Sequence, residues 1–241
     1  MNEEHKRHDS ELLARRAAQV QQGGARAAVL GVNDGLVSTL CIVLAVAGAG
    51  SSQQTVLLAG VAGLVAGSIS MAAGEWISVK SQVELFQGVL GDLKQMIKDD
   101  KELLVEQLRD SLEKNGYSTD TAGRATRELA TNEHHLFNRL SQHVIGLNPE
   151  QLGSPWVAAI SSFLLFAVGA LIALAPWFFG GGPFAIILSI VLTALGGLAV
   201  GAYIGISSGN SVSRAAMRQL LIILLASAVT YSAGQIFGTV I

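Results

Sequence analysis

The chain has 241 residues, of which 50% are hydrophobic and only 14% are charged, and its formal net charge is −2. A water-soluble domain of this length rarely has so few charges, so the composition excludes an ordinary soluble protein. We therefore expect a membrane protein.

Charged residues are concentrated in two segments. Residues 1–26 carry nine of them and residues 80–150 carry 21. The rest of the chain has only four: Asp34, Glu75, Arg214 and Arg218. The N-terminus lacks the short apolar core and cleavage site of a signal peptide, and the single cysteine, Cys41, cannot form a disulfide within the chain. The charge-poor tracts, 27–79 and 151–241, are predicted to lie in a bilayer.

Five stretches in these tracts contain the ~20 apolar residues that a helix needs to cross a hydrocarbon core of ~30 Å. They are residues 27–49, 54–79, 156–179, 183–207 and 215–238. The predicted fold is an all-α membrane protein with five transmembrane helices and a cytoplasmic helical insert between spans 2 and 3. Its parts are an N-terminal arm (1–26), spans 1 and 2 (27–79), the insert (80–150) and spans 3 to 5 (151–241).

Lysines and arginines near the span ends predict the orientation, because they favour the cytoplasmic side. The N-terminal arm has five, the insert has nine and the turn at 208–218 has two, whereas the other turns and the C-terminal tail have none. All basic segments share one side if the N-terminus is cytoplasmic and the C-terminus is outside. Since no organelle address is visible, we expect a bacterial plasma membrane.

Within the insert, residues 90–114 read as one amphipathic helix at ~100° per residue. Its apolar arc consists of Leu90, Leu93, Ile97, Leu104, Leu108 and Leu112. The opposite arc consists of Asp99, Glu102, Glu106, Asp110 and Glu113. We interpret this arc as a solvated face, because basic residues are interspersed. Asn115-Gly116 predicts a helix end, Ser118 or Thr119 starts the next helix, and a final helix is expected at about 131–145.

Small residues recur at close spacing in two spans. They are Gly197, Gly201, Gly205 and Gly209 in the fourth span, and Gly60, Gly63, Gly67, Ser70 and Gly74 in the second. Such spacing lets helices approach closely in lipid. Two interpretations stay open: close packing within one chain, and an interface between subunits.

Asp34 is an unusual residue for an apolar span. If the stretch NDG were a hairpin tip or a helix cap at the membrane surface, only 15 apolar residues would remain up to Gly50. They would extend about 22 Å, too short to cross. A helix that starts at Ala27 instead places Asp34 roughly 10 Å inside. A carboxylate there usually faces a cavity or a partner on a transport path. Asn33 either joins this site or satisfies backbone groups at a helix break.

Met71 and Glu75 are four residues apart in the second span and share one helix face. Counting back from Lys80 places them roughly 14 and 8 Å deep, similar to Asp34. Two carboxylates and a thioether suit Fe²⁺, or Mn²⁺, better than Ca²⁺ or Mg²⁺, which prefer oxygen ligands. Protons would compete with the metal for the same carboxylates. The plain alternative is that Met71 packs against apolar neighbours and that Glu75 reaches interfacial water.

Four stretches of the chain resemble the vacuolar iron transporter family (VIT1/CCC1-type proteins). They are RAAVLGVNDGLVST (26–39), AGLVAGSISMAAGEWISVKSQVEL (62–85), GLNPEQLGSPW (146–156) and RQLLIILLASAVTYSAGQIFG (218–238). The resemblance implies five spans and export of Fe²⁺ or Mn²⁺ from the cytosol in exchange for protons. It also implies a homodimer with the metal path between the first spans of two subunits, and Asp34 and Met71 as intramembrane ligands.

The chain departs from plant members of this family in two places. Glu75 stands where they have Gly, and Gly63 where they have Glu, a pattern that we associate with bacterial members. In the insert, six ligand positions of the plant proteins align with Leu93, Met96, Leu104, Gln107, Leu140 and Val144. The family's cytoplasmic metal site is therefore not reproduced, although the acidic arc and the histidines of EHH (133–135) and His143 offer other ligands.

We predict a divalent metal transporter in which Asp34 is a ligand and proton carrier, Met71 a soft ligand, and Glu75 a ligand or proton acceptor at the cytoplasmic mouth. The expected partners are metal ions, protons, lipid and a second copy of the chain. We expect no enzymatic activity, no resident cofactor and no nucleic-acid partner. Two other functions fit the sequence: a membrane-anchored scaffold or metal sensor that does not transport, and a channel that ignores a pH gradient.

Overall fold

The computed structural model describes residues 24–146 and 153–239, and every regular element among them is helical. These residues belong to two compact units. One unit comprises Gly23–Ile77 and Pro155–Ile241, and the described part of the other lies within Ser78–Ser154. Most of the N-terminal arm, and the part of the GLNPEQL motif at 147–152, lie outside the described residues.

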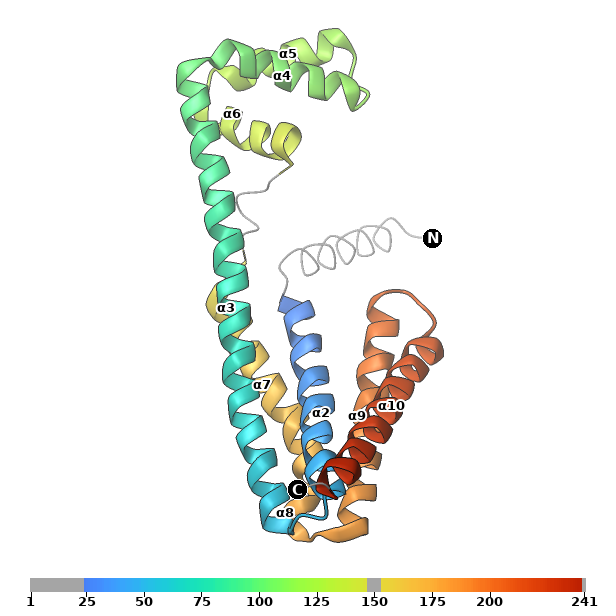
Figure 1. The fold of residues 1–241 in the computed structure, drawn as a ribbon. Helices are drawn as coiled ribbons and strands as arrows, with labels where there is room; N and C mark the ends of the chain where they lie inside the picture. Colours follow the sequence, from blue (N-terminus) through green and yellow to red (C-terminus); the bar gives the residue numbers. More distant parts are fainter. Residues whose placement is uncertain (1–23, 147–152, 240–241) are drawn as a thin grey trace. The chain divides into compact units, whose positions relative to one another are not determined.

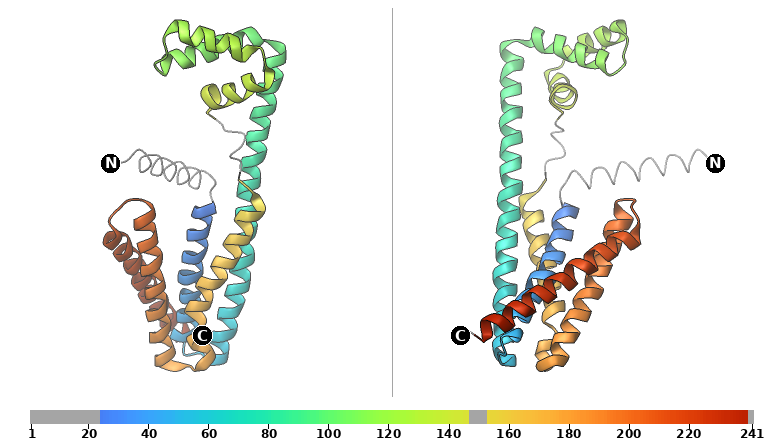
Figure 2. Two further views of the ribbon diagram at one scale, coloured as in Figure 1. Left: turned by 180° about the vertical axis from the view of Figure 1, so that it is seen from behind. Right: turned by 45° about the vertical axis from the view of Figure 1, so that its right-hand side comes forward.

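The first unit contains five helices that are long and apolar enough to cross a membrane, as predicted. They are α2 (Gly24–Gly48), α3 (Gln53–Asp99), α7 (Pro155–Leu174), α9 (Gly182–Ser207) and α10 (Val212–Gly238). Only the part of α3 up to Ile77 belongs to this unit. Successive helices run in opposite directions, so the start of α2, the start of α7 and the α9–α10 turn lie at one end of the bundle (Figure 1, Figure 2).

The third span is shorter than the predicted 156–179. Helix α7 ends at Leu174, and a separate turn, α8 (Pro176–Phe179), contains the last residues of the predicted span. Pro176 has no amide hydrogen to donate to the carbonyl group four residues earlier, and its ring crowds that carbonyl, so a regular helix stops before it. The 20 residues of α7 still suffice to cross the hydrocarbon core.

Helix α2 is the centre of this bundle and packs against α7, α9 and α10 (Figure 1). Gly31 and Gly35 of α2 lie against backbone atoms of Ser162 and Phe166 on α7. Gly169 of α7 lies in the same way against the backbone of α2. Because none of these glycines has a side chain, the two helices approach to backbone contact. This crossing positions the half of α2 that contains Asp34.

The glycine stripe of the fourth span packs against α10 of the same chain. Gly201 and Gly205 lie against the backbone of α10, and Gly197 lies against the side chain of Ile223. Gly209 follows the end of α9 with a φ of +67°, a conformation that glycine adopts without strain. For this stripe, close packing within one chain is therefore confirmed.

The membrane part of α3 also packs through glycines. Gly60 and Gly67 lie against side chains of α7, and Gly63 lies against Ile42 of α2. The outer face of α3 exposes large apolar side chains, among them Leu58 and Ile69, which are 71% and 58% exposed. Exposed apolar side chains of this kind suit contact with lipid or with a second protein chain.

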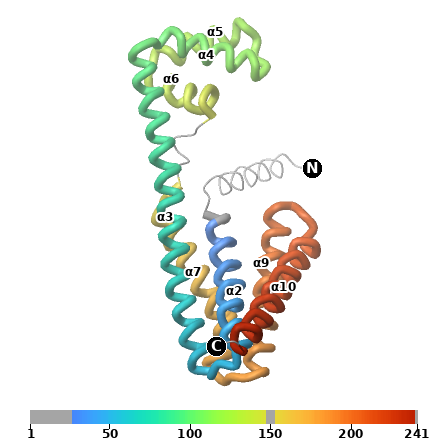
Figure 3. The backbone as a smooth tube through the Cα atoms, viewed as in Figure 1, coloured from blue at the N-terminus to red at the C-terminus, as the bar shows by residue number. Residues whose placement is uncertain are grey.

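In the second unit, the prediction of one continuous helix over residues 90–114 is wrong. Helix α3 ends at Asp99, and α4 (Lys101–Lys114) starts after a turn at Asp100 (Figure 3). The Asp100 backbone is non-helical, with φ −148° and ψ 76°, and its carboxylate accepts a hydrogen bond of 3.1 Å from the backbone N–H of Leu103. An aspartate that caps a new helix in this way competes with continuation of the old one.

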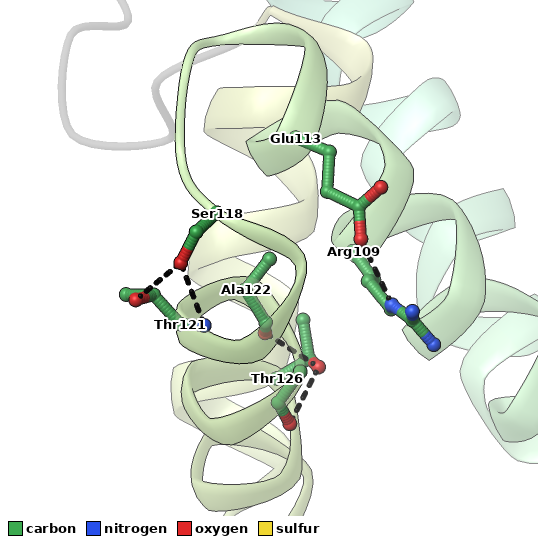
Figure 4. A network of polar contacts seen from close by, with 7 residues as sticks. Arg109, Glu113, Ser118, Thr121, Ala122 and Thr126 are labelled. Atoms are coloured by element: carbon green, nitrogen blue, oxygen red, sulfur yellow. Dashed lines mark hydrogen bonds and ion pairs between the residues drawn. The ribbon is translucent and has the colours of Figure 1, made fainter.

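Three further elements complete this unit: α5 (Thr119–Ala130), α6 (Glu133–Leu140) and the π-helical turn η1 (Ser141–Ile145). The predicted start of α5 is confirmed, because the hydroxyl of Ser118 accepts a hydrogen bond from the N–H of Thr121 (Figure 4). The predicted stop of α4 is also confirmed, since Gly116 has a φ of +96°. The helix expected at 131–145 is found as two elements, α6 and η1.

The predicted apolar arc supplies most of the core of this unit. The buried residues are Leu93, Ile97, Leu104, Leu108, Leu112, Ala122, Leu136 and Leu140. Leu90 is only half-buried. Glu113, on the acidic arc, forms an ion pair of 3.1 Å with Arg109 (Figure 4), and the other four acidic residues of the arc are exposed. The amphipathic pattern is therefore confirmed on both sides of the break at Asp100.

Candidate functional site

Asp34 lies inside α2 rather than at its end. The helix runs without interruption through residue 34, and the hydroxyl of Ser38 donates a hydrogen bond to the backbone carbonyl of Asp34. The predicted start of the helix well before Asp34 is confirmed. The carboxylate therefore belongs to the membrane-spanning part of the chain.

Asn33 does not mark a helix break, so that interpretation is wrong. Its side-chain oxygen accepts a hydrogen bond from Nε2 of Gln219, a buried residue of α10. This bond links α10 to α2 at the residue next to Asp34. Neither residue of the pair lines the cavity described below, so Asn33 is not part of the cavity wall.

All three predicted site residues line one cavity. It has a volume of about 630 Å³ and is open to the outside of the chain. Its lining residues are Asp34, Ser38 and Ile42 from α2, Gly63, Ala66, Gly67, Ser70, Met71, Gly74 and Glu75 from α3, and Phe166 from α7. Asp34, Met71 and Glu75 are each half-buried. The structure thus brings together the residues that the sequence placed at similar depth.

Glycines in α3 keep the cavity open. Met71 and Glu75 lie one turn apart, and Gly67 and Gly74 flank them on the same helix. A Cβ atom at Gly67 would overlap the ring of Phe166, whereas one at Gly74 would meet no atom within 4 Å. The α3 side of the cavity is therefore built from Ser70, Met71 and Glu75, together with Ala66 and three glycines that have no side chain.

Both carboxylates of the cavity are unpaired. Among residues 24–146 and 153–239, no hydrogen bond or ion pair involves the carboxylate of Asp34 or Glu75. The described part of this unit has three further charged residues, Arg26, Arg214 and Arg218. Arg214 and Arg218 do not line the cavity. Two uncompensated carboxylates in a partly enclosed space favour the binding of a cation.

The cavity offers three kinds of ligand atom: carboxylate oxygen, thioether sulfur, and the hydroxyls of Ser38 and Ser70. Ser38, Ser70 and Phe166 were not among the predicted site residues. The two serines have a signal in the sequence, because Ser38 follows Asp34 by one turn and Ser70 precedes Met71. Phe166 has none, since it comes from a helix far away in the sequence.

The insert contains no comparable constellation. Within the described ranges of the chain, no three His, Cys, Asp or Glu side chains lie close enough together to hold a metal ion. His134 and His135 have their ring centres 6.2 Å apart. Leu93, Leu104 and Leu140 are core residues of the insert.

Comparison with known proteins relates this chain to one family along most of its length. The family that matches is the VIT family, over residues 25–235. Vacuolar iron transporter homolog 1 of Oryza sativa subsp. japonica is 33% identical over 220 residues, which cover 88% of this chain and 73% of the relative. Vacuolar iron transporter of Acanthamoeba castellanii is 31% identical over 227 residues, or 90% of this chain and 80% of the relative. Vacuolar iron transporter 1 of Tulipa gesneriana is 26% identical over 86% of this chain and 84% of the relative.

Proposed function

This chain belongs to the VIT family, and on that premise we propose that it exports Fe²⁺ or Mn²⁺ from the cytoplasm across a membrane in exchange for protons. The observation that supports the proposal most directly is the cavity with two unpaired carboxylates and a thioether inside the membrane part of the chain. Relatives named as vacuolar iron transporters add weight to iron as a substrate.

Each of the three side chains has a distinct task in this proposal. Asp34 binds the metal and carries a proton when the metal has left, because one carboxylate cannot hold both strongly at once. Met71 supplies a soft sulfur ligand, which disfavours Mg²⁺ and Ca²⁺. Glu75, one turn from Met71, binds the metal or accepts a proton at the cytoplasmic mouth of the cavity.

A second copy of the chain completes the proposal. The three side chains leave a divalent ion short of the six ligands that Fe²⁺ or Mn²⁺ commonly takes, so water, the serine hydroxyls or a partner subunit must supply the rest. The open side of the cavity is compatible with a homodimer. We further propose a bacterial plasma membrane, with the N-terminus and the insert in the cytoplasm and the C-terminus outside, because all basic segments then share the cytoplasmic side.

The test is metal flux into proteoliposomes that hold a metal-sensitive dye, with and without a pH gradient. Asp34→Asn keeps the size of the side chain and removes its charge, and we expect it to lower flux at least about tenfold, equivalent to about 1.4 kcal/mol. Asp92→Asn is the matched control, because Asp92 is an exposed carboxylate of the insert and should leave flux unchanged. Met71→Leu should preserve flux better than Asp34→Asn but weaken the discrimination against Ca²⁺ and Mg²⁺.

Each alternative function predicts a different result. Flux that is equal with and without the pH gradient would make the protein a channel. No flux from correctly inserted natural protein under reducing conditions would indicate a scaffold or a metal sensor. An equal loss of flux in the Asp34 and Asp92 variants would remove Asp34 from the centre of the mechanism.

A further inference from the structure

Two arginines of α10 have no role in the metal cavity. Arg214 and Arg218 are exposed, and no ion pair involves either of them in the described part of the chain. The only acidic residues in the first unit are Asp34 and Glu75, which line the cavity, and neither forms an ion pair with an arginine. Two unpaired positive charges therefore lie one helical turn apart at the start of the last span.

The length of α10 places these arginines at the membrane surface. Its 27 residues extend about 40 Å, whereas the hydrocarbon core is only ~30 Å thick. If the apolar part from Leu220 onward fills the core, the first two turns, which contain Arg214 and Arg218, lie at the level of the lipid headgroups. Long basic side chains at such a position reach toward phosphate groups.

The same face of α10 continues as an exposed apolar stripe. At ~100° per residue, Arg214, Arg218, Leu221 and Leu225 fall within an arc of about 60°. Leu221 is 59% exposed and Leu225 is 67% exposed, and Val229, one turn further, is 59% exposed. Positive charge at one end and apolar surface along the rest match a molecule with an anionic head and an acyl chain.

We propose that Arg214 and Arg218 bind the phosphate of an anionic phospholipid whose acyl chain lies along Leu221, Leu225 and Val229. Guanidinium groups donate paired hydrogen bonds to phosphate oxygens, and two of them neutralise an anionic headgroup. The N-terminal end of the α10 dipole adds attraction for an anion at this place. A zwitterionic headgroup would bring its own positive charge to the site and bind more weakly.

The lipid site is linked to the helix that contains Asp34 through one hydrogen bond. An effect of lipid on metal transport would follow from this link, and this part of the inference rests on the proposed function. Gln219, the neighbour of Arg218, donates the hydrogen bond to Asn33, which precedes Asp34. A lipid bound to Arg218 would hold the start of α10, and through this bond the position of α2. We therefore expect anionic lipid to raise the rate of metal flux as well as to bind.

Native mass spectrometry of the full chain in detergent tests the binding, with phosphatidylglycerol and phosphatidylcholine of identical acyl chains as probes. Two arginine contacts at a membrane surface correspond to about 30-fold in affinity, so Arg214→Gln with Arg218→Gln should weaken phosphatidylglycerol binding by about that factor. Changing both to lysine should keep most of the binding. Arg109→Gln is the matched control, because Arg109 already pairs with Glu113 in the other unit, and it should bind lipid like the natural protein.

Four outcomes would overturn the proposal. The double glutamine variant could bind phosphatidylglycerol as tightly as the natural protein, or the natural protein could bind phosphatidylcholine equally well. Inorganic phosphate could also displace phosphatidylglycerol at equal concentration, which would make this a site for free anions. A change in the number of chains per particle in the double variant would assign the arginines to a subunit contact instead. Because lipid binding is measured without metal, it succeeds or fails independently of the proposed transport.

Discussion

Replacing Gly35 with alanine should weaken the crossing of α2 and α7. A Cβ atom at Gly35 would overlap the carbonyl oxygen of Phe166, and it would lie 2.9 Å from the Phe166 carbonyl carbon and 3.0 Å from the amide nitrogen of Ala170. All three are backbone atoms, so no side chain can rotate to make room. The helices must move apart by roughly 0.5–1 Å, which forfeits a quarter to a half of the dispersion attraction between facing atoms.

The expected magnitude is the balance of two effects. Overpacking costs up to about 3 kcal/mol where the neighbours cannot adjust. Alanine recovers about 1 kcal/mol through its higher helix propensity. The variant should therefore be less stable by about 2 kcal/mol, and its melting temperature should fall by about 4–8 °C for a chain of this size.

Thermal unfolding in detergent, followed by tryptophan fluorescence, measures this difference. Gly74→Ala is the control, because a Cβ atom at Gly74 meets nothing within 4 Å and the substitution should leave the melting temperature unchanged or raise it slightly. If Gly35→Ala were as stable as the natural protein, or if both variants lost equal stability, the reasoning from backbone contact would be refuted.

Three further predictions concern single polar contacts. Gln219→Leu removes the hydrogen bond to Asn33 and should cost about 1 kcal/mol; a double-mutant cycle with Asn33→Leu should yield a coupling energy, and a coupling of zero would show that the bond does not hold α10 to α2. Asp100→Ala removes the cap of α4 and should cost about 1 kcal/mol, visible as faster hydrogen exchange in the first turn of α4, whereas Asp110→Ala should leave this exchange unchanged. Lys80→Gln removes an ion pair with Glu84 whose side chains are 41% and 60% exposed, and chemical denaturation should detect a change below about 0.5 kcal/mol; a larger loss would contradict the view of an exposed pair.

The local features of this protein follow from its sequence because they depend on neighbouring residues alone. A long apolar stretch in lipid must satisfy its backbone groups internally, so each of the five stretches contains a helix long enough to span. The same constraint of length places Asp34 inside a span, since a helix that began after it would be too short to cross. The four-residue spacing of Met71 and Glu75 similarly assigns them to one face of α3.

Two local features were nevertheless misjudged. The periodicity of apolar residues continues across Asp100, yet the helix breaks there because the carboxylate caps the next helix. The third span ends before Pro176 although the following residues are apolar. The apolar pattern signals neither ending: a side-chain cap at Asp100 ends one helix, and the missing amide hydrogen of Pro176 ends the other.

The arrangement around the site was decided only by tertiary structure. Asp34 of α2 and Met71 of α3 line the same cavity, and Phe166 joins them from α7. The bond between Gln219 and Asn33 likewise joins residues 186 positions apart. Such contacts depend on how whole helices cross, and glycines at Gly31, Gly35 and Gly169 determine one of those crossings through the absence of a side chain. The sequence by itself determined the number of apolar spans, the helix face that Met71 and Glu75 share and most of the buried face of the insert, whereas only the packing of helices against one another decided which side chains meet.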